Sequence, residues 1–221
     1  MNYLFDLYGT LIDIRTDEKS GAFWKKISAM CNGKPVKERY AVLCAAQALP
    51  EGGEIDLLTV MQKITEEFGC AYSAAEFAEK FREASIKKLR LFDGTNELLA
   101  TIRRTGGKLY LLSNAQACFT YGELEKLDLA DKFDGIMLSS EIGFKKPSKK
   151  FFDIAFEKFG LSPKECVYIG NDLRDDVEGA RRAGMRSIYI PTAQSGRYPE
   201  KIEPDVRVKN HKELIKLLSA R

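Results

Sequence analysis

Histidine and tryptophan are almost absent from this chain of 221 residues, which holds one of each, His211 and Trp24. His211 lies near the C-terminus beside Lys212 and Glu213, where we do not expect a catalytic base. This argues against Ser-His-Asp and Cys-His hydrolases and against histidine-rich zinc sites. A catalyst in this chain therefore has to work through carboxylates, lysine and hydroxyl groups.

Cysteine is also scarce, and its spacing is irregular. The chain has five cysteines, an odd number, and no C-x-x-C pair. This distribution is typical neither of a disulfide framework nor of a zinc site. We therefore predict reduced thiols in a cytoplasmic protein. The cysteines are Cys31, Cys44, Cys70, Cys118 and Cys166.

Long apolar runs and a charge of one sign are missing too. No stretch reaches the ~18 apolar residues of a membrane helix, and Asp6 interrupts the N-terminal apolar residues too early for a signal peptide. Lysine and arginine number 35 against 32 acids, a net charge of +3. This balance gives no basis for binding nucleic acid or an anionic membrane. We expect a small-molecule substrate as the partner; the oligomeric state is not indicated.

Short apolar runs alternate with amphipathic segments along most of the chain. The runs end where polar residues begin, which is typical of buried strands, and the segments between them have helical spacing. This alternation predicts an α/β fold with a parallel sheet flanked by helices. The predicted strands are residues 3–5, 108–112, 135–138, 166–169 and 187–190; the predicted helices are 96–104, 149–159, 176–183 and 212–218.

Residues 14–91 interrupt this alternation. They contain no convincing strand but several amphipathic helical segments, separated by turn residues. Residues 73–76, Ser-Ala-Ala-Glu, form a predicted capping box. We therefore expect an all-helical cap domain at 14–91, inserted after the first strand of a core domain made of 1–13 and 92–221. The predicted cap helices are 22–30, 37–49, 57–68 and 73–89.

Reactive side chains come after the predicted strands in the sequence. Since ligands bind outside the carboxyl ends of parallel strands, these side chains are expected to meet at one edge of the sheet. A strand-end aspartate can act as a nucleophile, and an amine beside it can neutralise charge. A nearby cluster of acids favours a divalent cation with oxygen ligands, such as Mg²⁺. The side chains are Asp6, Thr10, Ser113, Asn114, Lys146, Asp172, Asp175 and Asp176.

These strand ends, taken in order, resemble the four motifs of the haloacid dehalogenase-like hydrolase superfamily. The first two motifs are similar to residues 5–11 (FDLYGTL) and 112–114 (LSN). The third and fourth are similar to residues 139–147 (SSEIGFKKP) and 168–180 (YIGNDLRDDVEGA). Each motif alone is weak evidence for the superfamily, but the ordered set of four is strong evidence and covers nearly the whole chain. The resemblance implies a Rossmann-like core and a helical cap.

The resemblance also implies a role for each matching residue. Asp6 would be the nucleophile, Ser113 would bond the transferring group, and Lys146 would stabilise the developing charge. Thr10 and Asn114 would help to bind the substrate. Mg²⁺ would be held by Asp6, by the main-chain carbonyl of Tyr8 and by residues of the fourth motif. The residues of the fourth motif are the acids Asp172 and Asp176 and the amide of Asn171.

The first motif departs from the phosphatase pattern at Tyr8. Phosphatases of the superfamily usually carry a second aspartate there as general acid and base. Tyrosine has a pKa near 10, so it is a weak acid and a scarce base at pH 7. A halide leaves without a proton, and DLYGT is similar to the first motif of 2-haloacid dehalogenases. In those enzymes a cap arginine receives the halide; Arg15 and Arg39 are the nearest candidates here.

The fourth motif points to a metal-dependent phosphatase instead. The dehalogenases are metal-free and carry fewer acids there, whereas Asp172, Asp175 and Asp176 remain in this chain. Without a cation, such acids would disable the nucleophile by raising carboxylate pKa values. Asn171 occupies the position of the motif's usual first acid, and either Asn171 or Asp172 could hold the metal.

The sequence therefore predicts a hydrolase, with three functions in competition. The favoured one is a Mg²⁺-dependent phosphatase that acts on a small phosphorylated metabolite through an aspartyl-phosphate. The alternatives are a metal-independent 2-haloacid dehalogenase and a ligand-binding relative with little catalysis.

Overall fold

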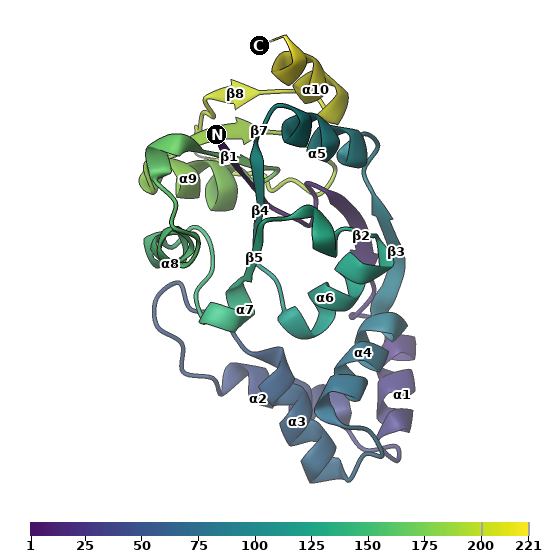
Figure 1. Cartoon of the computed structure of the whole chain (residues 1–221). Coiled ribbons are helices and arrows are strands. Elements are labelled where there is room, and N and C mark those ends of the chain that lie inside the picture. The colour runs from purple at the N-terminus through teal and green to yellow at the C-terminus, as the bar shows by residue number, and fades with distance from the viewer. Residues whose placement is uncertain (200, 221) are drawn as a thin grey trace.

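The computed structural model of the chain describes residues 1–199 and 201–220. Its centre is a six-stranded sheet in which each strand pairs in parallel with its neighbours, in the order β5-β4-β1-β6-β7-β8 (Figure 1). This order is the Rossmann-like α/β arrangement that the alternating pattern predicted. The strands are β1 (Asn2–Phe5), β4 (Lys108–Ser113), β5 (Gly135–Leu138), β6 (Cys166–Gly170), β7 (Arg186–Tyr189) and β8 (Val206–Arg207).

Helices cover both faces of this sheet, because alternate strand residues point to opposite sides. On one face, Tyr3 and Phe5 join a core with helices α5 (Thr95–Arg104) and α10 (His211–Ser219). On the other face, Leu4 joins a second core. That core includes α8 (Lys149–Phe159) and α9 (Gly179–Arg182).

Two further segments of the core were not predicted. Helix α6 (Ala117–Lys126) follows β4, and β8 pairs with β7 at the edge of the sheet. The predicted helix at 176–183 is a π-helical segment, η3 (Leu173–Glu178), continued by α9. The remaining short elements are α7 (Ser139–Ile142), η1 (Ala130–Lys132) and η2 (Pro163–Glu165).

Four helices between the first and second sheet strands make a separate cluster below the sheet in Figure 1. Phe23, Ile27, Ile64 and Phe81 are buried in this cluster, apart from the two cores of the sheet. The capping box predicted at Ser73 and Glu76 is present at the start of the fourth helix. The helices are α1 (Gly21–Met30), α2 (Val36–Ala45), α3 (Leu57–Phe68) and α4 (Ala74–Ser85).

Two antiparallel strands connect these helices to the sheet, which corrects the expectation of helix and no strand there. Strand β2 (Ile12–Thr16) pairs with β3 (Ile86–Leu91), so α4 ends at Ser85 and not at residue 89. The helical spacing of apolar residues continues past Ser85. The backbone there is nevertheless extended, because its N–H and C=O groups form hydrogen bonds with the distant strand β2.

The expectation that every cysteine is reduced was wrong for one pair. A disulfide joins Cys31, directly after α1, to Cys70, which follows the left-handed Gly69 at the end of α3. Their separation of 39 residues carries no local signal, and only helix packing brings the two thiols together. Cys44, Cys118 and Cys166 are free.

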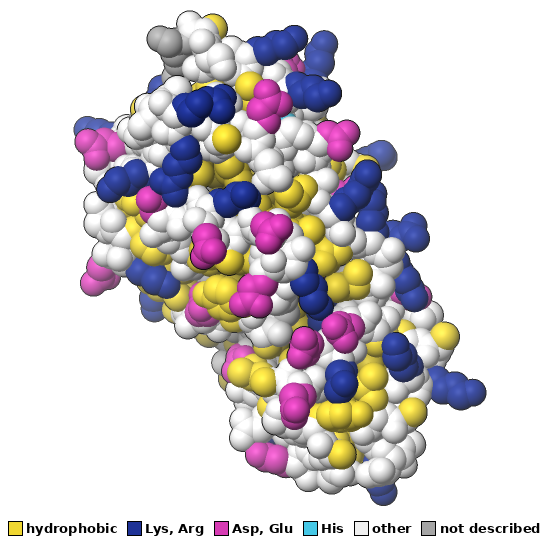
Figure 2. Space-filling view, turned by 45° about the vertical axis from the view of Figure 1, so that its right-hand side comes forward, with side chains coloured by type: hydrophobic (Ala, Val, Ile, Leu, Met, Phe, Trp, Pro, Cys, Tyr) yellow, Lys and Arg dark blue, Asp and Glu magenta, His cyan; other side chains and the backbone are white. Residues whose placement is uncertain are grey.

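Charges of both signs are interspersed on the face of the molecule that Figure 2 shows. In the view of Figure 2, basic and acidic side chains alternate over both lobes, with apolar side chains between them. Among residues 1–199 and 201–220, no helix has the length and apolar character to span a membrane.

Candidate active site

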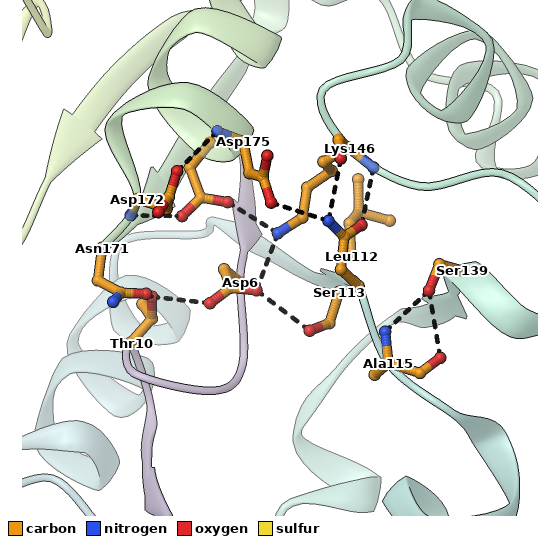
Figure 3. Close-up of polar contacts among 12 residues, drawn as sticks. Asp6, Thr10, Leu112, Ser113, Ala115, Ser139, Lys146, Asn171, Asp172 and Asp175 are labelled. Atoms are coloured by element: carbon orange, nitrogen blue, oxygen red, sulfur yellow. Dashed lines mark hydrogen bonds and ion pairs between the residues drawn. The ribbon is translucent and has the colours of Figure 1, made fainter. Parts of the chain in front are cut away.

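The carboxyl ends of β1, β4 and β6 bring the predicted site residues together (Figure 3). Asp6 follows β1, Ser113 ends β4, and Asn171 follows β6. Lys146 comes from the loop between α7 and α8 and reaches the same point. Parallel strands end at one edge, which explains why residues more than 100 positions apart in the chain meet there.

Lys146 is the centre of the site, with 2% of its side chain exposed. Its ammonium donates three hydrogen bonds: to Oδ1 of Asp6 at 2.8 Å, to Oδ1 of Asp176 at 2.7 Å and to the hydroxyl of Tyr168 at 2.8 Å. Burial opposes the charge, but the carboxylates of Asp176 and Asp6 outweigh it and raise the pKa of Lys146 well above its usual value. The amine is therefore a fixed positive charge.

Asp6 accepts a hydrogen bond from each of three side chains. Besides Lys146, Ser113 donates to Oδ1 at 3.1 Å and Thr10 donates to Oδ2 at 3.1 Å. These three bonds hold the carboxylate in one orientation, and its side chain, 9% exposed, is not sealed from solvent. A carboxylate oriented in this way suits nucleophilic attack on a bound substrate.

Asp176 is the second buried carboxylate of the site. Burial raises its pKa to about 7; Lys146 opposes this rise and the negative charge of Asp6 adds to it. Its Oδ2 accepts from the main-chain N–H of Asp172 at 2.9 Å. Two buried carboxylates thus share a single ammonium, and the site carries an excess of negative charge.

Asn171 and Asp172 are neighbours in sequence but have different surroundings. Oδ1 of Asn171 lies 3.1 Å from the Thr10 hydroxyl, which also contacts Asp6. Oδ1 of Asp172 instead accepts from the N–H groups of Arg174 and Asp175 and caps η3, while its Oδ2 accepts from Tyr198. The amide therefore faces the nucleophile, and the neighbouring carboxylate is occupied elsewhere.

Gly9 is required where the first motif approaches Asn171. Its φ of +83° lies in the left-handed region, and a Cβ there would fall 2.5 Å from the amide nitrogen of Asn171. The turn from Tyr8 to Thr10 therefore packs directly on the fourth motif.

Asn114 orients its neighbours, and all its strong hydrogen-bonding atoms are engaged. Its Oδ1 accepts from the main-chain N–H of Lys146, and its Nδ2 donates to the main-chain carbonyl of Lys146 and to Asp175. These bonds fix the loop that carries Lys146. The substrate-binding role of Asn114 stays a prediction.

Tyr8 has a hydrogen-bond network that sequence analysis missed. Its hydroxyl donates to Oε2 of Glu123 at 2.5 Å and lies 2.9 Å from the Thr120 hydroxyl, both on α6. Arg82, from α4, pairs with the other oxygen of Glu123 at 2.6 Å. Burial and the charge of Glu123 raise the pKa of Tyr8 far above its ordinary value. Glu123 was missed because α6 was not predicted.

A loop of the helical cluster lies against the third motif. The main-chain N–H of Glu54 donates to the carbonyl of Gly143, and that of Lys145 donates to the carbonyl of Gly52. The Glu54 side chain accepts from the Ser139 hydroxyl at 2.9 Å. The loop between α2 and α3 therefore reaches the chain segment that carries Lys146.

The two arginines considered as halide acceptors lie apart from this cluster. Arg39 pairs with Glu67 between α2 and α3, and Arg15 is exposed on β2. The arginine beside Tyr8 is Arg82, whose guanidinium carbon lies 6.0 Å from the centre of the Tyr8 ring. It was hidden among the polar residues of an amphipathic helix.

The donor set around Asp6 fits a hard divalent cation such as Mg²⁺. Oδ2 of Asp6 and Oδ1 of Asn171 both lie 3.1 Å from the Thr10 hydroxyl, and the excess negative charge of Asp6 and Asp176 favours a cation. Oxygen ligands of this kind are those that Mg²⁺ prefers. Within residues 1–199 and 201–220, no three acidic, histidine or cysteine side chains are gathered for a metal, so amide or carbonyl oxygens would have to complete the set.

Comparisons with known proteins agree with this geometry. The family model described as haloacid dehalogenase-like hydrolase matches residues 3–190. Phosphoserine phosphatase of Thermus thermophilus is 32% identical over 158 residues, which cover 70% of this chain and 62% of that enzyme. The match thus spans less than two thirds of that relative.

Solved structures show the same fold. A 2-haloacid dehalogenase from Pseudomonas syringae is 20% identical, with a TM-score of 0.68 and coverage of 99% of this chain and 98% of the other. The HAD-hydrolase YfnB of Bacillus subtilis, solved bound to magnesium, is 22% identical, with a TM-score of 0.62 and coverage of 99% and 98%. The residues that converge at Asp6 come from all four sequence motifs.

Proposed function

Because this chain is a member of the haloacid dehalogenase-like hydrolase family, we propose that it is a Mg²⁺-dependent phosphatase of a small phosphorylated metabolite. The observation that carries the proposal is the ammonium of Lys146, which contacts the buried carboxylates of Asp6 and Asp176 together. A site that transfers a dianionic phosphoryl group needs concentrated positive charge beside an oriented nucleophile. That the chain is a hydrolase follows from its family. That its substrate is a phosphorylated compound is what we propose.

In the proposed reaction, Asp6 attacks phosphorus through a carboxylate oxygen. The bond between phosphorus and the leaving oxygen breaks as an aspartyl-phosphate forms, and water then releases inorganic phosphate and restores Asp6. Lys146 holds the carboxylate of Asp6 in line and stabilises the charge on the phosphoryl oxygens. The Ser113 hydroxyl, which bonds Asp6 in the free site, would turn to a phosphoryl oxygen.

A divalent cation would supply the remaining positive charge against the transferring group. We propose that Asp6, the carbonyl of Tyr8, the amide of Asn171 and Asp176 hold it, while Asp172 serves as a helix cap. Phosphoryl transfer depends on positioning and charge neutralisation, so these residues act by orienting oxygen atoms.

We further propose that residues 14–91 form a cap domain which determines the choice of substrate. Their helices have a hydrophobic core of their own, and the loop at Glu54 contacts the segment before Lys146. A cap of this kind excludes water when it closes. The name of the phosphoserine phosphatase relative supports a phosphorylated substrate, but not a particular one.

Dehalogenation remains a second candidate because of one residue. Tyr8 stands two positions after Asp6, where phosphatases of the family usually carry an aspartate that donates a proton. A halide leaves without a proton, so a dehalogenase does not need that aspartate. A 2-haloacid dehalogenase also shares the fold. Asp176 favours the phosphatase, since a second buried carboxylate beside Asp6 calls for a cation.

One paired assay separates the functions. Purified protein is tested on an aryl phosphate with and without EDTA, and halide release from 2-chloropropionate is measured in parallel, with Asp6→Asn as the inactive control. Phosphate release that is lost on chelation and in Asp6→Asn supports the proposal. Halide release that ignores EDTA would replace it with dehalogenation. Neither activity, together with thermal stabilisation by a bound metabolite, would indicate a ligand-binding relative.

A further inference from the structure

A second polar cluster lies beside the candidate site, where the cap helices meet the core, and none of the motifs accounts for it. It consists of Tyr8 from the first motif, Thr120 and Glu123 from α6, and Arg82 from α4. Glu123 is 2% exposed, and the Arg82 side chain is 14% exposed. Burying two charged side chains costs free energy even when they are paired. This cost indicates that the cluster does more than stabilise the fold.

We infer that Glu123, braced by Arg82, is a positioning residue that holds the Tyr8 hydroxyl away from the reacting atoms. The Asp6 site then acts on phosphoryl compounds whose leaving group departs without a proton. Acyl phosphates and phosphoanhydrides belong to this class, and alkyl phosphate esters do not. The inference rests on the proposed phosphatase function and narrows its substrate class.

Counting hydrogen atoms supports this role for Glu123. A tyrosine hydroxyl has one hydrogen to donate, and in Tyr8 it is directed to the Glu123 carboxylate at 2.5 Å. Arg82 occupies the other Glu123 oxygen at 2.6 Å and so holds the carboxylate in place. Arg82 is itself held by Glu18 at 3.4 Å, at the start of the cap segment. The hydroxyl therefore has no proton left for a substrate oxygen.

The donors that contact Asp6 are engaged as well. The three N–H groups of Lys146 are directed to Asp6, Asp176 and Tyr168, and the Tyr168 hydroxyl donates to the carbonyl of Leu112. Thr10 donates to Asp6, and so does Ser113 in the free site; during transfer Ser113 is assigned to a phosphoryl oxygen. Within the described part of the chain, no side-chain hydrogen bond links the Tyr8 cluster to Asp6.

The chemical consequence concerns only the first step. Asp6 forms the new oxygen–phosphorus bond, and the leaving oxygen keeps the electron pair of the bond that breaks. An alkoxide is too basic to leave in this form, whereas a carboxylate, a phosphate or a nitrophenolate is stable as an anion. Water then attacks the aspartyl-phosphate, its proton passes to the phosphate released, and Asp6 is restored.

The first test measures kcat/KM of the Mg²⁺-loaded enzyme on aryl phosphates whose phenols have pKa values from about 4 to about 10. Acetyl phosphate and an alkyl phosphate, glycerol 3-phosphate, extend the series. We expect kcat/KM to fall at least about threefold for each unit of leaving-group pKa, and to be at least about 100-fold lower for glycerol 3-phosphate than for acetyl phosphate. A flat series would show that a proton is donated and would overturn the inference. Turnover of none of these phosphates would instead overturn the proposed function.

Two variants of Tyr8 test whether a missing proton donor is the cause. Tyr8→Asp introduces a short carboxylic acid, and Tyr8→Asn is its matched control, equal in size but unable to donate a carboxyl proton. Both lose the same packing. We expect turnover of glycerol 3-phosphate to be at least about tenfold higher in Tyr8→Asp than in Tyr8→Asn, with similar turnover of aryl phosphates. Equal turnover of glycerol 3-phosphate by the two would overturn the inference.

The role of Glu123 has its own readout, which a loss of folded protein would not imitate. Glu123→Gln is compared with Glu125→Gln, an exposed glutamate on the same helix. We expect Glu123→Gln to shift the ¹³Cζ resonance of Tyr8 and to raise the ratio of alkyl to aryl phosphate turnover at least about threefold, with no change in Glu125→Gln. An unmoved resonance and an unchanged ratio would remove Glu123 as a positioning residue.

Discussion

The ammonium nitrogen of Lys146 lies 2.8 Å from Oδ1 of Asp6, although 140 residues separate the two in the chain. The same ammonium is 2.7 Å from Oδ1 of Asp176. One buried cation therefore keeps two carboxylates close together, and both the proposed chemistry and the local stability depend on it.

Lys146→Met should abolish turnover and destabilise the core. The substitution leaves Asp6 and Asp176 buried together without their cation. We expect kcat/KM to fall by at least about 100-fold and the free energy of unfolding to fall by about 3–5 kcal/mol. Enzyme assays and urea unfolding measure the two effects. Lys145→Met, at the exposed neighbouring residue, is the control and should retain the stability of the parent protein.

The response to Mg²⁺ should distinguish Asn171 from Asp172. We expect saturating Mg²⁺, at about 100 times its Kd, to stabilise the parent protein by about 2.7 kcal/mol. Asn171→Ala should lose this response. Asp172→Ala should keep it and lose only about 1 kcal/mol as a missing helix cap. Thermal unfolding with and without Mg²⁺ measures both, and the opposite pattern would assign the metal to Asp172.

His211 should make stability depend on pH in mildly acidic solution. Burial lowers its pKa, while the carbonyl of Thr10 and the charge of Asp93 oppose this; its Nε2 has no hydrogen-bond partner among the described residues. The unfolded chain therefore binds a proton more readily than the folded one. The contribution of His211 is complete above about pH 6.5 and is lost as the pH falls through the folded-state pKa.

The measurement is urea unfolding between about pH 5 and pH 8. We expect the parent protein to lose stability toward pH 5 faster than His211→Gln does. Because this is the only histidine, the difference between the two curves isolates its titration. Parallel curves would mean that His211 titrates normally in the folded protein.

The disulfide should be visible as missing thiols. Under denaturing, non-reducing conditions we expect three reactive thiols per chain, because Cys31 and Cys70 are joined. Five thiols would support the reduced protein expected from the sequence. Closing a loop of this length should contribute about 3–4 kcal/mol to the stability of the helices that the disulfide joins. Cys31→Ser with Cys70→Ser should remove it, while Cys44→Ser serves as the single-thiol control.

Local pattern was enough to predict five of the six strands of the sheet and the residues at their ends. Buried parallel strands appear as apolar runs, and the residue after each run must lie at the sheet edge where the ligand binds. Asp6 and Ser113 were placed in this way and Lys146 by the third motif, and their convergence is confirmed by direct hydrogen bonds. The capping box at Ser73 is equally local and was also correct.

The features that were missed depend on partners far away in the chain. Strand β3 continues the helical spacing of α4, yet pairing with β2 makes it extended. Cys31 and Cys70 show no motif, and Glu123 and Arg82 look like ordinary polar residues of their helices until α4 and α6 pack together. None of these pairings leaves a periodic signal within a short window.

The amino-acid sequence by itself determined the α/β class and which residues lie at the edge of the sheet that carries the candidate site. It could do so because strand burial and strand ends are local properties of the chain. Only the tertiary structure decided what those residues do there. It turned Asn171 toward Asp6 and Asp172 onto a helix end, and it directed the Tyr8 hydroxyl to Glu123. Such choices follow from hydrogen-bond partners supplied by distant segments, so they exist only after the chain has packed.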